Sequence, residues 1–563
     1  MWQIINSHSK KKQQKVTECT LLPDETNDYF VTVVSGLLKN LKTNKNHQYL
    51  ITHGISMPNS LFSFRKVTFI EVRDIIRKLK NKNSKDLMGL NVTLIKSIRE
   101  IILYPLTKII NICLQQSVFP KILKEALVIP IYKNKGDTAD VSNYRPISIL
   151  PVFSKIFEKC MANQIISFFE ENRLFLDCQH GFRKGHNTVS ALLEFMTHIM
   201  EGYEGREFAG ATFCDLSRAF DCVSHQLLIE KIECYNFSES SKKLIISYLD
   251  NRSQQVRICG VTSASRELKT GVPQGSILGP LLFLIFINNL PACCPGNYTL
   301  YADDTTICLR DINFVNLNMR MEEAQSSAQD WFTANELLLN PTKTQTLFLS
   351  LKNLDEQEPI RFLGVLLDPK LQWNVHLDSV ANKLNTATFM LRNLANNVSQ
   401  NALRTAYFAI CHSHLSYATL VWGRATDSSR IFALQRRAVR IVARLGYRDD
   451  CVQAFKSLDI LTLPSIYIYQ SLVYVKSNLK HFEKNSDFHN HNTRGGADLR
   501  IPYYRLEKCQ RGPNYNAVKF YNKVPSNIRI LPLNSFKSKI RKFLSLNAFY
   551  TYQDFLNCDL TYM

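Results

Sequence analysis

Three aspartates occupy positions where carboxylates could hold metal ions. Asp215 ends the apolar segment AGATFCD, and Asp303 and Asp304 lie in the middle of 298–309, YTLYADDTTICL, which predicts two strands around a tight turn. Divalent cations that assist phosphoryl transfer are bound by carboxylate oxygens on rigid elements. A strand-end aspartate facing an Asp-Asp turn would form such a site; alternatively, the pair only supplies good turn residues.

A second set of polar residues lies near glycines and prolines. Gln274 and Gly275 belong to GVPQGSILGP, whose composition suits a close approach of the backbone to a ligand, although a plain turn has the same residue types. Arg145, in SNYRPIS, precedes a proline. A guanidinium matches phosphate geometry through paired hydrogen bonds, whereas a lone arginine more commonly forms a surface salt bridge.

The elements that must position these residues mix strands and helices without regular alternation, which predicts the α+β fold class. The predicted strands are 126–133, 209–215, an exposed strand at 253–258 and the hairpin at 298–309. The predicted helices are one that starts at Thr68, 94–115 with a kink at Pro105, 152–172, one that starts at His225, 380–394, 402–418 and 430–445.

The chain changes character after about residue 370, where amphipathic helices dominate. The helix predicted at 430–445 carries Arg430, Arg436, Arg437, Arg440 and Arg444 beside an apolar stripe. Such a helix is either a nucleic-acid face or an ordinary surface helix, and the pattern leaves both open. The final part, with HNTRGGADLR and KVPSNIRILP, predicts a loosely structured appendage rather than a second enzyme.

Composition limits the class of protein. The 563 residues are enough for several cores, and 45% hydrophobic and 21% charged residues are values of a globular protein. The 69 lysines and arginines exceed the 48 acidic residues by 21, which suits a nucleic acid or merely keeps the protein in solution. The 15 cysteines show no Cys-x-x-Cys pair, so reduced thiols are expected. The longest apolar run, 277–287, is too short for a bilayer, and no membrane partner is expected.

Five motifs in chain order carry a resemblance to a known family. SNYRPIS, FCDLSRAFD, GVPQGS, YADD and FLGV resemble the reverse transcriptases of non-LTR (LINE-type) retrotransposons, most closely the jockey and CR1-like group. The resemblance is strong over 70–370 and weaker toward the C-terminus. It implies an RNA-directed DNA polymerase that uses an RNA template, a DNA primer and dNTPs, with two Mg²⁺ or Mn²⁺ ions.

The resemblance also implies roles for individual residues. It assigns Asp215, Asp303 and Asp304 to the metal site, and Lys343 to protonation of the departing pyrophosphate. It assigns Arg145, Phe220, Gln274 and Gly275 to the nucleotide site. Phe220 would exclude a 2′-hydroxyl by a steric clash, unless it is simply a core aromatic. It assigns template and primer contacts to Arg183 and Lys184 of QHGFRKGHNT and to Phe362, Leu363 and Gly364 of FLGV.

The implied architecture is a right-hand polymerase with helical extensions at both ends. The expected divisions are an N-terminal connecting region at 1–68, a helical lead-in at 69–111, fingers and palm at 112–370, a helical thumb at 371–450 and an accessory C-terminal region at 451–563. Family members usually carry an endonuclease ahead of the polymerase, and the space here is too short for one, so endonuclease function is not expected in this chain.

Some features depart from the family pattern. The family often has Asn-Asp where this chain has Asn288 and Asn289, which puts a local hydrogen bond in doubt. Neither an RNase H acidic set nor a zinc knuckle is recognised in the sequence. The alternatives are a non-catalytic nucleic-acid-binding relic, or a polymerase like group II intron maturases or telomerase. Nuclear or cytoplasmic localisation is expected for a retroelement protein.

Overall fold

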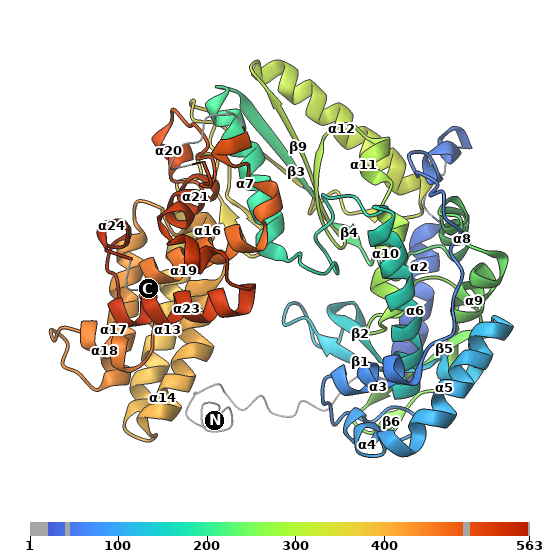
Figure 1. Cartoon of the computed structure of the whole chain (residues 1–563). Coiled ribbons are helices and arrows are strands. Elements are labelled where there is room, and N and C mark those ends of the chain that lie inside the picture. The colour runs from blue at the N-terminus through green and yellow to red at the C-terminus, as the bar shows by residue number, and fades with distance from the viewer. Residues whose placement is uncertain (1–20, 40–44, 488–495, 561–563) are drawn as a thin grey trace.

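The computed structural model describes residues 21–39, 45–487 and 496–560. Figure 1 shows two lobes joined at the top by a sheet, with mainly the first half of the chain on the right and the last part of the chain on the left. Helices and strands are mixed between residues 125 and 367, which confirms the prediction of an α+β fold.

Helical elements open the described chain. They are α2 (Pro23–Leu38), η1 (Lys45–Ile51), α3 (Phe69–Lys78), α4 (Val92–Ser97), α5 (Arg99–Gln116) and η2 (Lys121–Leu123). Thr68 and Glu71 form a capping box at the start of α3, which satisfies two free backbone N–H groups. Helix α5 continues through Pro105. The interruption expected at this proline lies instead at Ile98, between α4 and α5.

Strands and helices then alternate irregularly. The strands are β1 (Glu125–Tyr132), β2 (Tyr144–Ile149), β3 (Phe208–Cys214), β4 (Leu216–Ser217), β5 (Arg252–Ile258), β6 (Val261–Thr262), β7 (Arg266–Leu268), β8 (Asn297–Tyr301), β9 (Asp304–Asp311), β10 (Leu338–Leu339), β11 (Gln345–Leu349), β12 (Ile360–Phe362) and β13 (Val365–Leu367). Between them lie η3 (Val141–Asn143), α6 (Val152–Glu171), α7 (Thr188–Glu204), α8 (His225–Cys234), α9 (Glu239–Leu249), α10 (Leu278–Ile287), α11 (Leu290–Cys293) and α12 (Phe314–Ala334).

The remaining elements of the described chain are helices. They are α13 (Asn374–Ala395), α14 (Gln400–Tyr407), η4 (Phe408–His412), α15 (Ser413–Ser416), α16 (Thr419–Trp422), α17 (Ser428–Ala443), α18 (Val452–Ser457), α19 (Leu463–Ser477), η5 (Leu479–His481), η6 (Asn485–Asp487), α20 (Glu507–Gln510), α21 (Pro513–Lys523), α22 (Ser526–Arg529), α23 (Leu533–Asn547) and α24 (Tyr552–Asn557).

Two sheets organise the first 370 residues. The central sheet has the strand order β11-β3-β9-β8 and is antiparallel throughout. A second sheet has the order β2-β1-β5-β6, with β7 also on β5, and its β1–β5 pair is parallel. In β5 every second residue is buried, beginning with Arg252. This strand lies inside its sheet, so the expectation of an exposed strand at 253–258 was wrong.

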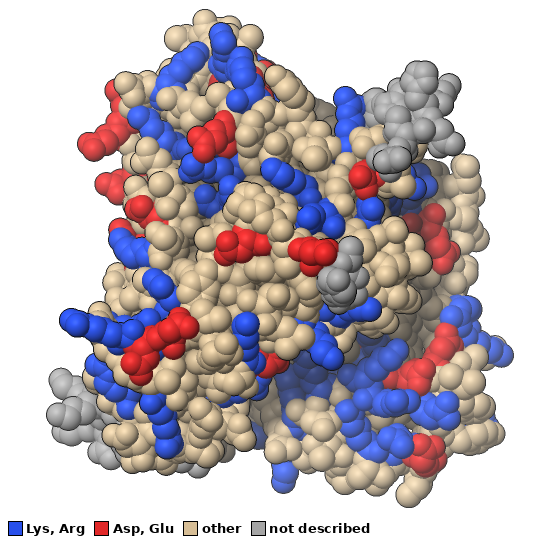
Figure 2. All heavy atoms as spheres, turned by 60° about the vertical axis from the view of Figure 1, so that its left-hand side comes forward, with Lys and Arg blue, Asp and Glu red and all other residues tan. Residues whose placement is uncertain are grey.

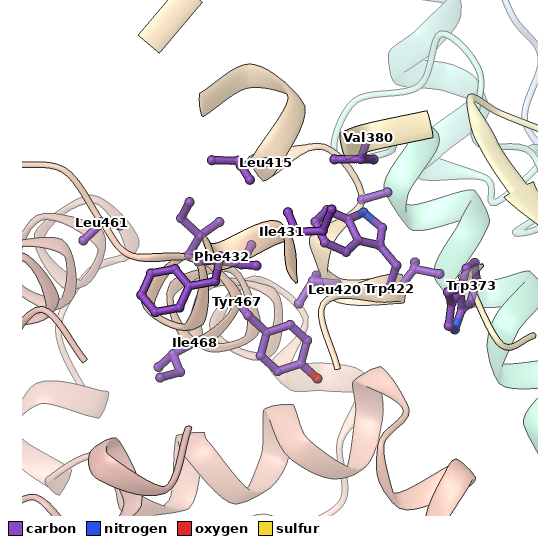
Figure 3. Close-up of a cluster of buried hydrophobic side chains, with 14 of the residues drawn as sticks. Trp373, Val380, Leu415, Leu420, Trp422, Ile431, Phe432, Leu461, Tyr467 and Ile468 are labelled. Atoms are coloured by element: carbon purple, nitrogen blue, oxygen red, sulfur yellow. The ribbon is translucent and has the colours of Figure 1, made fainter. Parts of the chain in front are cut away.

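Apolar side chains form two large cores. The first lies around α5, α6, α8–α10 and α12. The second joins α7 and one face of the central sheet to α13–α19 and α21–α24. Figure 3 shows part of the second core, formed by Trp373, Val380, Leu415, Leu420, Trp422, Ile431, Phe432, Leu461, Tyr467 and Ile468. The described helices after residue 450 therefore contribute to this core, and the prediction of a loosely structured appendage was wrong for them. The first part of HNTRGGADLR lies outside the described residues.

The most apolar helix is an interior element. Nine of the ten residues of α10 are buried, and a helix that is apolar all round requires burial on every side. No helix among the described residues is long and apolar enough to cross a membrane. Figure 2 shows basic side chains outnumbering acidic ones on one face, with several of them in the hollow at the lower right.

Candidate active site

The register of the central sheet brings together the aspartates predicted to bind metal. β3 ends at Cys214, which lies opposite Thr305 of β9. Asp215 is therefore the first residue beyond the last pair in β3, and Asp304 is the residue before its partner in β9. Two segments separated by almost ninety residues thus place carboxylates at the same end of the sheet.

The turn between β8 and β9 has two residues. Tyr301 pairs with Asp304, so Ala302 and Asp303 form the turn. The hairpin is the one that the sequence predicted, but Asp304 is the first residue of β9, so the expectation of an Asp-Asp turn was wrong by one residue. Ala302 has a φ of 59°, a left-handed conformation that is uncommon for residues other than glycine. A strained two-residue turn is held in place only where surrounding contacts determine it.

Burial and nearby negative charges change the pKa of both Asp303 and Asp304. Burial raises the pKa of Asp303, and the negative charge of Asp215 raises it further, while Arg145 opposes the shift. Burial, followed by the charges of Asp303 and Asp215, raises the pKa of Asp304 to about 6. Like charges in a partly desolvated site favour the protonated form. A bound cation would relieve this repulsion.

The described residues contain no group of three or more His, Cys, Asp or Glu side chains that stand close enough together to hold a metal ion as they are. One of the three carboxylates is instead paired with a cation, because the Lys343 amine lies 3.1 Å from Oδ2 of Asp215. The loop that carries Lys343 is tied to the same place, since the backbone N–H of Asn340 donates to the carbonyl of Asp215.

The segment QHGFRKGHNT is hydrogen-bonded to the β8–β9 hairpin and supports its turn. Gln179 accepts hydrogen bonds from the backbone N–H groups of Gly181, at 2.8 Å, and Ala302, at 3.2 Å, through its side-chain oxygen. The N–H of His180 donates to the carbonyl of Leu300 in β8. A Cβ on Gly181 would lie 2.2 Å from the backbone nitrogen of Ala302. Sequence reasoning missed this support, although the Gln-x-Gly pattern was visible.

Four basic side chains surround the site, and two of them, Lys133 and Arg218, were not predicted. Burial lowers the pKa of Lys133, and the nearby charges of Arg218, Arg145 and Lys343 lower it further. Lys133 follows β1 directly, and its N–H donates to the carbonyl of Asn143 just before β2. Its position at the end of an apolar strand, opposite the segment that leads to Arg145, was the available signal.

Gln274 and Gly275 are used in contacts within the protein. The Gln274 amide donates to Oδ1 of Asp221 at 2.8 Å, and burial raises the pKa of Asp221. Gly275 has a φ of +112°, and a Cβ there would lie 2.5 Å from the carbonyl oxygen of Ser148. This glycine is required by the close approach of β2, whether or not a ligand also approaches it.

Phe220 is partly buried between other aromatic rings. Its ring stacks on Phe283 with centroids 4.6 Å apart, and Phe182 approaches its edge at 6.3 Å. Phe182 is 59% exposed, so this cluster reaches the surface. Both interpretations of Phe220 thus remain compatible with its surroundings, because the ring contributes to packing and still lies at the margin of the site.

Arg183 and Lys184 differ sharply. The Arg183 side chain is only 8% exposed and forms an ion pair with Glu170. Its guanidinium also donates to the carbonyl of Leu176 and lies over the ring of Phe175. These contacts leave the arginine with a structural role here, contrary to the expected phosphate contact. Lys184 is exposed and remains a predicted template contact.

The FLGV motif forms the β12–β13 hairpin, whose turn is Leu363 and Gly364. The ring of Phe362 is buried against Phe195 and Phe213, with centroids 5.2 and 5.1 Å away. The Phe362 side chain therefore belongs to the core and is not available to a primer, contrary to the expected primer contact. The hydroxyl of Tyr417 donates to the carbonyl of Leu363. A Cβ added to Gly364 would lie 3.3 Å from the ring of Tyr417.

The asparagine that departs from the family pattern is fully used. The fully buried amine of Lys231 donates to Oδ1 of Asn289 at 2.7 Å and to the carbonyl of Phe286. Burial holds the pKa of Lys231 well below its usual range. The Asn289 amide donates to the carbonyls of Leu50 and Ile51, so the local hydrogen bonds that the departure put in doubt are present.

The arginines of α17 also bind within the protein. Arg430 pairs with Asp378, Arg440 donates to the carbonyl of Asp449, and Arg444 donates to the carbonyl of Val398. These contacts favour the ordinary-helix interpretation over a nucleic-acid face.

Comparison with known proteins identifies the central part of the chain. Residues 131–367 match the reverse transcriptase (RNA-dependent DNA polymerase) family. The chain is 32% identical over 428 residues to a probable RNA-directed DNA polymerase from transposon BS of Drosophila melanogaster, which covers 70% of this chain and 47% of the relative.

Two other Drosophila melanogaster proteins give similar results. Identity is 29% to the probable RNA-directed DNA polymerase from transposon X-element, over 72% of this chain and 47% of the relative. It is 27% to the RNA-directed DNA polymerase from mobile element jockey, over 67% and 44%. The chain thus spans about half the length of the curated relatives that it matches.

Proposed function

We propose, because residues 131–367 belong to the reverse transcriptase family, that this chain is an RNA-directed DNA polymerase of a non-LTR retrotransposon. It would extend the 3′-hydroxyl of a DNA primer with dNTPs on an RNA template. The observation that carries the proposal is the pairing of Cys214 with Thr305, which brings Asp215 to the end of the sheet that carries Asp303 in the turn and Asp304 beside it.

Three carboxylates would form the site for divalent cations. Asp215, Asp303 and Asp304 would hold two Mg²⁺ or Mn²⁺ ions, since hard cations prefer carboxylate oxygens. Such ions lower the pKa of the primer hydroxyl and neutralise charge on the triphosphate. Burial, and then the charges of neighbouring carboxylates, raise the pKa of Asp303 and Asp304. This supports the function, because cation binding would offset the repulsion.

The basic side chains would bind the triphosphate. Arg145, Lys133 and Lys343 surround the carboxylates with positive charge, which suits a polyphosphate. Lys343 would leave Asp215 when a cation binds and become free to protonate the departing pyrophosphate. Phe220 would exclude ribonucleotides by contact with a 2′-hydroxyl. Gln274 and Gly275 would line the same pocket.

We assign the parts of a right hand by the same proposal. Fingers and palm would occupy 112–370, the helical thumb 371–450 and an accessory region 451–563, preceded by the lead-in at 69–111 and the connecting region at 1–68. Lys184 would contact the template, and the backbone of Leu363 and Gly364 would contact the primer terminus. The second core makes the thumb and the accessory region one packed body.

Primer extension on poly(rA)/oligo(dT) with Mg²⁺ tests the proposal. Wild type should incorporate dTTP, and Asp303→Ala should lose about a thousandfold in rate, because several kcal/mol of transition-state charge stabilisation disappears. Thermal unfolding should show that Asp303→Ala is at least as stable as wild type, since repulsion is removed. Equal rates for both proteins, or a wild type without activity, would contradict a polymerase and favour a binding relic.

The steric gate has its own test. Phe220→Ala should raise the efficiency of ribonucleotide incorporation relative to deoxynucleotides by about ten- to a hundredfold, because the obstruction to a 2′-hydroxyl is removed. Phe283→Leu is the control, since it alters the stacking partner and leaves the gate ring in place. Unchanged discrimination in Phe220→Ala would identify Phe220 as a packing residue only.

A further inference from the structure

Helix α2 precedes the matched residues 131–367, yet it is firmly docked beside the active site. Asn27 is fully buried. Its amide donates to the carbonyls of Gln254 and Ala264 and to the hydroxyl of Ser263, at 2.9–3.2 Å. Its oxygen accepts from the Gln254 amide at 3.0 Å. A buried amide that uses its donors and acceptor in this way fixes a helix in one position.

Contacts on either side of Asn27 reinforce the docking. Oδ1 of Asp24 accepts from the N–H of Ala264 at 2.8 Å, and Asp28 pairs with Arg266 at 2.5 Å. Phe30 is buried with Val256 and other apolar residues of the second sheet. The helix is thus held along its length against β5 and the β6–β7 segment.

The docked helix places Tyr29 against an arginine of the catalytic motif. The guanidinium carbon of Arg218 lies 5.4 Å from the centre of the Tyr29 ring, within the range of a cation–π contact. The Arg218 Nη2 is 3.4 Å from the Tyr29 hydroxyl, which is long for a hydrogen bond. The face of the ring therefore contributes more than the hydroxyl.

Arg218 connects Tyr29 to the nucleotide side of the site. Its guanidinium lies 3.8 Å from Oδ2 of Asp221, whose Oδ1 accepts from the Gln274 amide at 2.8 Å. Arg218 has a φ of 52°, a conformation that costs energy in a residue with a side chain. Its position therefore depends on neighbours such as Tyr29.

A small cavity has walls from both regions. It is lined by Phe30 and Val34 of α2 and, opposite them, by Asp221, Gln274 and Arg252. Residues outside the matched part of the chain thus form one wall of the space behind the predicted nucleotide site.

We propose that Tyr29 is a positioning residue for the incoming nucleotide, which acts by holding Arg218 over Asp221 and thereby fixing the side chain of Gln274. The proposal rests on the proposed polymerase function and extends it to the N-terminal helix. Tyr29 itself would not touch the nucleotide. Its loss should weaken nucleotide binding while the carboxylates at the catalytic turn keep their positions.

Steady-state primer extension separates these effects. Tyr29→Leu removes the ring and should raise the KM for dTTP about five- to tenfold, the effect expected of a partly buried cation–π contact, with kcat within about twofold of wild type. Tyr29→Phe keeps the ring and loses only the long hydroxyl contact, so its KM should stay within about twofold. Asp28→Ala is the matched control on the same helix, with KM unchanged, because it removes only an exposed ion pair.

A double mutant tests the route through Arg218. In an Arg218→Leu background, Tyr29→Leu should add less than about twofold to the KM, because the partner of the ring is already absent. Independent, multiplicative effects would overturn the proposal. So would a Tyr29→Leu protein with a lower melting temperature and lower kcat but an unchanged KM, which is the behaviour of a purely structural residue.

Titration of intrinsic fluorescence with dTTP and Mg²⁺ measures binding without turnover. Tyr29→Leu should weaken dTTP binding by the same factor as it raises KM, and equal affinities of wild type and Tyr29→Leu would overturn the proposal. A wild type that binds dTTP but extends no primer would overturn the polymerase function while the ratio of affinities still decides the role of Tyr29.

Discussion

Two short hairpins with similar turns present different chemistry. The β8–β9 turn contains Ala302 and Asp303, and the β12–β13 turn contains Leu363 and Gly364; left-handed residues occur in both. The first hairpin belongs to the four-stranded central sheet and carries carboxylates at its tip. The second is a sheet of two strands, with its aromatic side chain buried.

The difference lies in where support comes from. The first turn is supported from behind by backbone and by the Gln179 side chain, so its own side chains are free for chemistry. The second hairpin is anchored by Phe362 in the second core and by Tyr417 at its turn, so its aromatic side chain is not available for contact. A residue type within a motif therefore predicts where the residue lies in the fold better than it predicts which of its atoms face a ligand.

The largest effect should come from crowding the first turn. Gly181→Ala would place a Cβ 2.2 Å from the nitrogen of Ala302, so the turn must shift, and a displacement of about 1 Å at reacting groups costs about a hundredfold in rate. Primer extension and circular dichroism should show lost activity in a folded protein.

Gly185→Ala, in the same segment, is the control for Gly181→Ala. It has no neighbour within 4 Å but a φ of +86°, so it should cost only about 1 kcal/mol of stability. Equal activity losses in both variants would mean that the segment acts through the template rather than through the turn.

The second hairpin should respond in stability rather than chemistry. Phe362→Ala should lower the free energy of unfolding by about 3–5 kcal/mol, because a buried ring leaves a cavity between Phe195 and Phe213. Urea denaturation measures this change. Leu363→Ala, at the partly exposed turn, should cost less than about 1.5 kcal/mol. A stable Phe362→Ala protein with impaired primer binding would restore the direct primer contact.

The smallest effect concerns pH. The pKa of Asp304 rises from 3.8 to about 6 in the folded chain, so the folded state binds this proton more tightly than the unfolded state. The free energy of unfolding should therefore fall as pH rises from about 4 to about 6 in the absence of divalent cations. The Asp304 carboxyl is partly desolvated by its surroundings yet remains accessible to solvent, so solvent screening keeps the change small.

Thermal unfolding across this range, with EDTA present, compares wild type with Asp304→Asn. The variant should lack the part of the slope that belongs to this carboxyl, and Mg²⁺ should raise the melting temperature of wild type more at pH 7 than at pH 5. If the melting temperatures of the two proteins depend on pH with the same slope, the carboxylates of this site do not raise one another's pKa.

Local patterns predicted most elements correctly because they depend on near neighbours. The hairpin at 298–309, the strand before Asp215 and the helix 152–172 follow from alternation and apolar spacing. The closeness of Asp215 to the turn required the β3–β9 register, which no local pattern encodes. The motif order supplied that information by resemblance.

The errors arose from tertiary contacts. Arg183 looks like a phosphate ligand in sequence, yet Glu170 and Phe175 engage it. Helix α19 lacks regular amphipathic spacing because it packs on several sides against the second core. Lys133 was missed because a lysine after a strand is ordinary until its neighbours are known.

The second core restricts how the left-hand lobe can move. Its apolar residues extend from α7 and β3 to α24, so within the described chain a swing of these helices about residue 370 would expose buried surface. If the chain acts as proposed, a bound nucleic acid would then advance by sliding along a rigid helical lobe rather than by a rotation of that lobe.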